Sequence, residues 1–143
     1  MKLVPEMIPQ TSFFVNVRSM VSSAQWDILR KGCYKNAQYK CEICGGIGKK
    51  HPVECHEVWQ YDNDTAIQKL VRLIALCPAC HEVVHIGLAG VRGRTQQAIS
   101  HMIKVNGITK QQAEQLIDQS WQLWQQRNTI EWVLDITILE ANK

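Results

Sequence analysis

Net charge, long hydrophobic runs and internal repeats are all scarce or absent in this sequence of 143 residues. The 16 Lys and Arg exceed the 13 Asp and Glu by a net charge of only +3, which permits binding to a polyanion but does not by itself predict it. No hydrophobic run approaches the roughly 20 residues of a membrane-spanning helix, so we expect no contact with a membrane. The first residues, broken by Pro5 and Pro9, lack the apolar segment of a secretory signal. We therefore expect a cytoplasmic protein.

Composition is ordinary for a folded protein, with 45% hydrophobic and 20% charged residues. The length predicts a single domain over residues 1–143, and the mixture of helical and strand patterns predicts an α+β fold. Six cysteines are present. Four of them form two Cys-x-x-Cys pairs, which favours a metal site in a reducing compartment over a disulfide framework.

The two pairs are Cys41-Glu42-Ile43-Cys44 and Cys77-Pro78-Ala79-Cys80. Each pair can present two sulfurs on a tight turn, and four thiolates complete a tetrahedral zinc site with no open position. We therefore predict a structural zinc ion on Cys41, Cys44, Cys77 and Cys80. The remaining cysteines are Cys33, expected to be a small buried residue of a helix, and Cys55.

Histidines accompany the second pair. His81 follows Cys80 directly and His85 comes four residues later, so both lie on one face of a helix that begins at this pair. Upstream, the segment Val-Glu-Cys-His-Glu-Val-Trp at residues 53–59 reads as a short strand with His56 in its middle. We expect the fold to hold His56 against His81 and His85.

The remaining elements are predicted from periodicity and capping residues. Ser22, with Gln25 three residues later, predicts a helix over about 23–37, and Thr109 with Gln112 predicts another that runs to about Arg127. A further helix is expected over 96–105, and Gly87, Gly90 and Gly93 are expected to break the helix after His85. Strands are predicted over 12–19, 70–76 and 131–139, the first and last of them paired and the middle one joined to the His56 strand by a long loop.

Residues 37–86 resemble the His-Asn-His (HNH) endonucleases, which have the ββα-metal (His-Me finger) fold. The likeness rests on three features together: Cys41-x2-Cys44, the strand around Cys55-His56, and Leu76-Cys77-x2-Cys80-His81-x3-His85. It implies a ββα core held by a four-cysteine zinc site. The sequence pattern adds an N-terminal helix before this core and, over residues 94–143, a C-terminal helical extension that ends in a strand.

The resemblance also implies an activity, the metal-dependent hydrolysis of phosphodiester bonds in DNA. His56 matches the general base that activates water, and His81 matches the histidine that binds the catalytic ion, with His85 as a second ligand. That ion would be a second divalent metal, Mg²⁺, Mn²⁺, Ni²⁺ or Zn²⁺, which neutralises charge on the phosphate.

Two positions depart from the family pattern. Cys55 stands where Asp or His is usual, so either a transition metal accepts this thiolate as a ligand, or Glu54 or Glu57 replaces the usual carboxylate. Arg72 stands where the family has asparagine. Either Asn63 takes that role, or Arg72 joins the catalytic residues by holding a phosphate. The expected nucleic-acid contacts are Lys49, Lys50, Arg72, Arg92 and Arg94.

Two other readings compete with the nuclease. Cys55 and Arg72 favour a non-catalytic zinc module that binds nucleic acid or protein, whereas the retention of all three histidines favours activity. A redox or metal-sensing protein that uses Cys33 and Cys55 is a third reading. His51 and His101 are expected to be solvated and to have no role.

Overall fold

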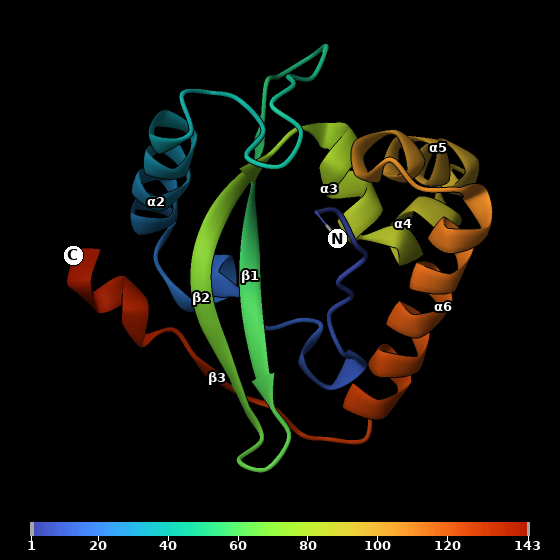
Figure 1. Cartoon of the computed structure of the whole chain (residues 1–143). Coiled ribbons are helices and arrows are strands. Elements are labelled where there is room, and N and C mark those ends of the chain that lie inside the picture. The colour runs from blue at the N-terminus through green and yellow to red at the C-terminus, as the bar shows by residue number, and fades with distance from the viewer. Residues whose placement is uncertain (1, 143) are drawn as a thin grey trace.

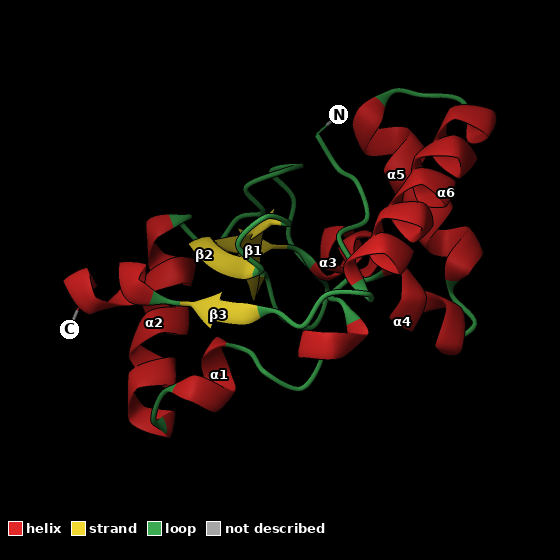
Figure 2. Ribbon diagram, turned by 90° about the horizontal axis from the view of Figure 1, so that it is seen from below, coloured by secondary structure: helices red, strands yellow, loops and turns green. Residues whose placement is uncertain are grey.

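The fold is known from a computed structural model that describes residues 2–142. A three-stranded sheet forms its centre, with strand order β1 (Glu54–Asp62), β2 (Ile67–Leu76) and β3 (Val133–Asp135). Helix α2 (Ser23–Asn36) lies on one side of the sheet, and the helices that follow β2 lie on the other (Figures 1 and 2). The predicted α+β class is confirmed.

Strands β1 and β2 form an antiparallel hairpin in which His56 pairs with Ile74. Both strands are longer than predicted, so the connection is a turn over residues 63–66 and not a long loop. Asp62 stabilises this turn, because its side chain accepts hydrogen bonds from the backbone N–H groups of Asp64 and Thr65. The pairing register shifts between Val58 and Trp59.

The helices agree with the sequence pattern in most respects. Thr109 forms the predicted capping box with Gln112, and Gly107, at φ +64°, ends the helix before it in the left-handed conformation. The Ser22 side chain caps α2 by accepting from the Gln25 N–H. The helices that follow the hairpin are α3 (Pro78–Val84), α4 (Ile86–Val91), α5 (Thr95–Asn106) and α6 (Lys110–Arg127).

The helix break after the second cysteine pair lies elsewhere than predicted. It occurs at His85, whose backbone (φ −99°, ψ 56°) is not helical, and α4 then continues through Gly87 and Gly90. Gly93, at φ +70°, follows the helix end. Gly87 packs closely against Trp121, since a Cβ there would lie 3.3 Å from its ring.

Two strand predictions were wrong. Residues 12–19 form no strand, because Asn16 and Ser19 cap each other and begin the short helix α1 (Val17–Met20). The last strand is only Val133–Asp135, and it pairs in parallel with β2. The Asp135 side chain accepts from the Thr137 N–H, which turns the chain into a 3-10 helix over Thr137–Asn142. The predicted pairing of the two terminal segments is therefore absent.

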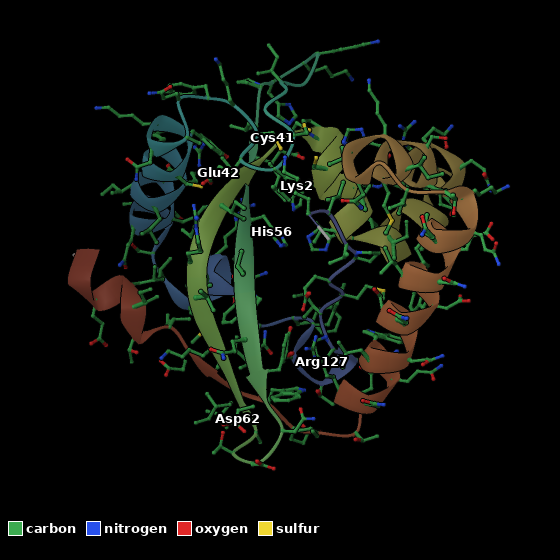
Figure 3. The ribbon with its side chains drawn as sticks, viewed as in Figure 1. Lys2, Cys41, Glu42, His56, Asp62 and Arg127 are labelled. Carbon is green, nitrogen blue, oxygen red and sulfur yellow. The ribbon has the colours of Figure 1, made fainter. Side chains whose placement is uncertain are left out.

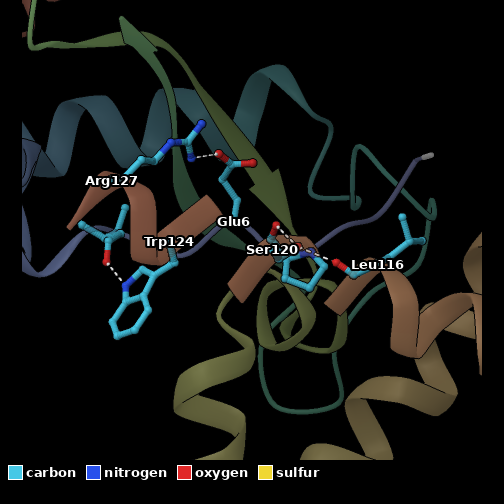
Figure 4. Close-up of polar contacts among 7 residues, drawn as sticks. Glu6, Leu116, Ser120, Trp124 and Arg127 are labelled. Carbon is cyan, nitrogen blue, oxygen red and sulfur yellow. Dashed lines mark hydrogen bonds and ion pairs between the residues drawn. The ribbon is translucent and has the colours of Figure 1, made fainter. Parts of the chain in front are cut away.

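The N-terminal segment runs between the sheet and α6 (Figure 1). Three contacts fix it to α6 (Figure 4): Arg127 pairs with Glu6 at 3.1 Å, Trp124 Nε1 donates to the Ile8 carbonyl, and the Ser120 hydroxyl contacts the Pro5 carbonyl. The segment thus forms one wall of the space beside β1.

Hydrophobic side chains gather in two clusters, one on each side of the hairpin. The first packs α3–α6 against the N-terminal segment around the fully buried Leu3, Leu76 and Met102. The second packs α2 and the C-terminal 3-10 helix against Trp59 and Leu70. The hairpin between them is held on both faces, which gives side chains at its end fixed positions.

Candidate metal centre

Four cysteines meet where the hairpin joins α3. Their sulfur atoms all lie within 4.8 Å of one another, and Cys44 Sγ lies 3.6 Å from Cys77 Sγ. Cys41, Cys77 and Cys80 are buried, whereas Cys44 is exposed. Four thiolates at this separation can hold a metal ion such as zinc in tetrahedral geometry. The predicted four-cysteine cluster is confirmed.

Each cysteine pair lies on a turn with a backbone N–H aimed at a sulfur. Cys77 caps α3, with its sulfur 3.4 Å from the Cys80 N–H and Pro78 at the first helical position. In the first pair the Cys44 N–H lies 3.5 Å from Cys41 Sγ. Such N–H groups stabilise the negative charge of thiolates. The sequence spacing alone therefore builds most of this site.

Cys41 and Cys80 influence each other within the cysteine cluster. The Cys80 thiol lowers the pKa of Cys41, and the same interaction, together with burial, raises the pKa of Cys80. The thiolate is the form of cysteine that binds a metal.

His101 also belongs to this centre, contrary to the expectation that it is solvated. Its Nε2 lies 3.2 Å from Cys80 Sγ, and its ring is half-buried on α5. An N–H donated to a metal-bound thiolate would reduce the charge on that sulfur. The sequence offers no spacing signal for this contact, because it depends on how α5 packs on α3.

The second group of metal-ligand side chains consists of His56, His81 and His85, as expected. One nitrogen from each lies within 4.8 Å of the other two. The ring centroids are 5.2 Å apart for His56 and His81, 5.1 Å for His56 and His85, and 4.7 Å for His81 and His85. His56 comes from the start of β1 (Figure 3), His81 from α3, and His85 from the break between α3 and α4.

Burial keeps two of these imidazoles neutral. Burial, with the charges of the neighbouring histidines, lowers the pKa of His56 to about 3. Burial and the charge of His81 lower the pKa of His85 to about 4, although Glu54 acts in the opposite direction. Neutral imidazole is the form that binds a metal or accepts a proton, so at neutral pH both side chains are ready for either role.

Glu54 connects the cluster to β1. One of its oxygens lies 3.1 Å from His81 Nδ1 and the other lies 3.2 Å from His51 Nε2. Burial raises the pKa of this carboxyl group, but the bonds from the two histidines leave it lower than usual. A carboxylate on Nδ1 fixes the ring of His81 so that its Nε2 remains free. Glu54, and not Glu57, is thus the carboxylate beside the histidines, because Glu57 accepts from the Val17 N–H.

Cys55 is not brought to the histidines. It precedes His56 on the strand and so points to the opposite face, where its thiol hydrogen bonds with Cys33 of α2. This bond lowers the pKa of Cys33, and together with burial it raises the pKa of Cys55. Cys33, predicted to be buried, is half-buried.

Arg72 is likewise held elsewhere. Its guanidinium group pairs with Glu42 of the first cysteine turn, and the same Glu42 carboxylate accepts from the Ala75 N–H. The other predicted nucleic-acid residues are exposed, and Arg94 pairs with Glu82 at 2.6 Å. They lie on the loop before β1 and on the segment after α4: Lys49, Lys50, Arg92 and Arg94.

A cavity of about 1060 Å³ opens beside the histidines and is lined by all three. Three consecutive residues of β1, Cys55, His56 and Glu57, border it. Its other walls are mostly apolar, and no Lys or Arg of the described residues lines it. These walls include Phe13, Phe14, Leu88, Val91, Trp121 and Trp124.

A scan of the chain against protein-family models finds no match, and searches among curated proteins and solved structures find none either. Over residues 2–142, none of the helices has the length and hydrophobicity required to cross a lipid bilayer.

Proposed function

We propose that this protein is a metal-dependent endonuclease of the HNH type, which hydrolyses phosphodiester bonds in DNA. The observation that supports it best is the meeting of His56, His81 and His85 at one end of an antiparallel hairpin followed by a helix. A purely structural zinc module has no need for these three side chains beside a four-cysteine cluster.

The donor atoms fit a divalent transition metal. Three imidazole nitrogens suit Zn²⁺ or Ni²⁺ better than Mg²⁺ or Mn²⁺, which prefer oxygen ligands. Such an ion would neutralise charge on the phosphate and lower the pKa of water. The ion would also provide positive charge in the cavity, because none of the described residues that line it is a Lys or Arg.

The side chains of this chain have distinct parts in the reaction. Glu54 fixes the ring of His81, and mostly apolar walls border the cavity beside the histidines. His56 faces the same cavity, where it either takes a proton from water, as its match to the family base implies, or helps to hold the ion. Lys49, Lys50 and Arg92 would contact the nucleic-acid backbone outside the cavity.

One observation favours a different function, a zinc-stabilised module that binds nucleic acid or protein without cleaving it. Arg72 and Arg94, which were expected to contact phosphate, are occupied by Glu42 and Glu82, and the cavity walls are apolar. In this second reading the cavity serves for binding only.

Cleavage of supercoiled plasmid separates the two functions. Wild-type protein is assayed with Mg²⁺, Mn²⁺, Ni²⁺ or Zn²⁺ and with a chelator, beside His85→Ala and the control His101→Gln, which lies outside the histidine cluster. If the protein is a nuclease, it should nick the plasmid with a transition metal. This activity should fall at least about 100-fold in His85→Ala and persist in His101→Gln. Absence of nicking with every metal, in protein that retains its cysteine-bound zinc, would support the binding module instead.

A further inference from the structure

We propose that His56, His81 and His85 bind a single transition-metal ion together, so that His56 is a metal ligand and not a general base. This inference concerns the ion on which the proposed function rests, but it stands on the geometry of the three side chains. A histidine nitrogen bound to a metal has no lone pair left with which to accept a proton. The two roles of His56 are therefore alternatives.

The distances place His56 as an equal member of the group. Its ring centroid is 5.2 Å from that of His81 and 5.1 Å from that of His85, close to the 4.7 Å between the other two. Nitrogens that bind one tetrahedral zinc at about 2.0–2.1 Å lie about 3.4 Å apart. Small side-chain rotations would bring the three nitrogens, now within 4.8 Å, to that separation.

The surroundings of the cluster resemble those of a metal ligand set. Glu54, two residues before His56 on β1, holds His81 Nδ1 at 3.1 Å, so the free nitrogen of His81 is Nε2. A carboxylate on the second nitrogen is the usual outer partner of a metal-bound histidine. His51 supports the other oxygen of Glu54 at 3.2 Å.

The fourth position of the ion would face the cavity, which all three histidines line. Three neutral imidazole ligands would leave the bound divalent ion positively charged, and the acidic side chains near it are Glu54, which contacts His81, and Glu57, which lines the cavity. The site would therefore take an anionic oxygen of a phosphate or carboxylate group, attached to a body that the apolar walls accept.

Cobalt titration tests the ligand role of His56. The protein is first loaded with zinc at the four cysteines, and Co²⁺ is then added while the visible absorption of nitrogen-coordinated cobalt is recorded. Wild type and the control His101→Gln, which changes a histidine beside the cysteine cluster, are expected to bind one Co²⁺ per chain. His56→Ala is expected to bind it more than about 100-fold more weakly, a larger loss than removal of an outer-shell partner causes. Equal affinity in His56→Ala would overturn the proposal and restore the role of base.

A second variant guards against a folding defect in His56→Ala. His56→Cys places a thiolate at the same position, and a bond between this sulfur and cobalt adds a charge-transfer band in the near ultraviolet. If this charge-transfer band appears, the side chain at position 56 contacts the ion. If the folded His56→Cys protein binds cobalt without showing the band, the proposal is overturned. If the wild-type protein binds cobalt as expected but does not cleave plasmid, the nuclease function is refuted and the metal site at the three histidines is retained.

Discussion

The cysteine cluster and the histidine cluster, which share helix α3, differ in their side chains and in their surroundings. The cysteine cluster has four potential ligands on two tight turns, three of them buried. The histidine cluster has three potential ligands from separate elements, and a cavity of about 1060 Å³ adjoins it. A closed set of four thiolates stabilises a fold, whereas three nitrogens beside a cavity leave a position for a ligand or substrate. The number of potential ligands and the access to them thus predict different roles for the two clusters.

The largest effect should follow from loss of a cysteine ligand. Cys80 is fully buried, and structural zinc binding in zinc-finger peptides amounts to about 10–16 kcal/mol, as much as the whole stability of a typical domain. Cys80→Ser is expected to abolish cooperative thermal unfolding and to release the metal. Cys33→Ser, on α2, is the matched control and should retain both. A Cys80→Ser protein that keeps its zinc and melts within a few degrees of wild type would refute a structural role for this cluster.

An intermediate effect is expected at the histidine cluster when its outer carboxylate is changed. Glu54→Gln keeps the size of the side chain but removes the charge that fixes the ring of His81. The affinity for Co²⁺ should fall by about 10–100-fold, with unchanged zinc content at the cysteines. His51→Ala, which removes only the other partner of Glu54, should have a smaller effect. If both variants bind cobalt like wild type, Glu54 does not position His81.

The smallest effect is expected at His101, which contacts Cys80 from α5. Loss of its hydrogen bond in His101→Ala should reduce the free energy of unfolding by about 1 kcal/mol and speed the removal of zinc by a chelator. The second ion at the histidines should bind as in wild type. His101→Gln, which can still donate an N–H, should restore the slow release. Equal release rates in all three proteins would show that the contact does not affect the thiolate.

The sequence predicted what depends on local spacing. The cysteine cluster follows from two Cys-x-x-Cys turns, and the proximity of His81 and His85 follows from helical spacing. His56 joined them as predicted because the hairpin that carries it returns directly to α3. A short stretch of chain contains all the information for these contacts.

What depends on long-range packing could not be predicted. The contact of His101 with Cys80 spans 21 residues and depends on the position of α5. Residues 12–19 contain the aromatic and β-branched side chains typical of a strand, yet Asn16 and Ser19 cap a helix there. Cys55 could not be excluded as a metal ligand until the position of α2, which carries its partner Cys33, was known.

The most direct test of the central claim, that one chain holds two unlike metal sites, is native mass spectrometry during zinc titration. Wild type is expected to bind two zinc ions per chain, one resistant to a mild chelator and one removed by it. His85→Ala should retain only the resistant ion. A single ion in wild type, or a second ion that persists in His85→Ala, would contradict the account.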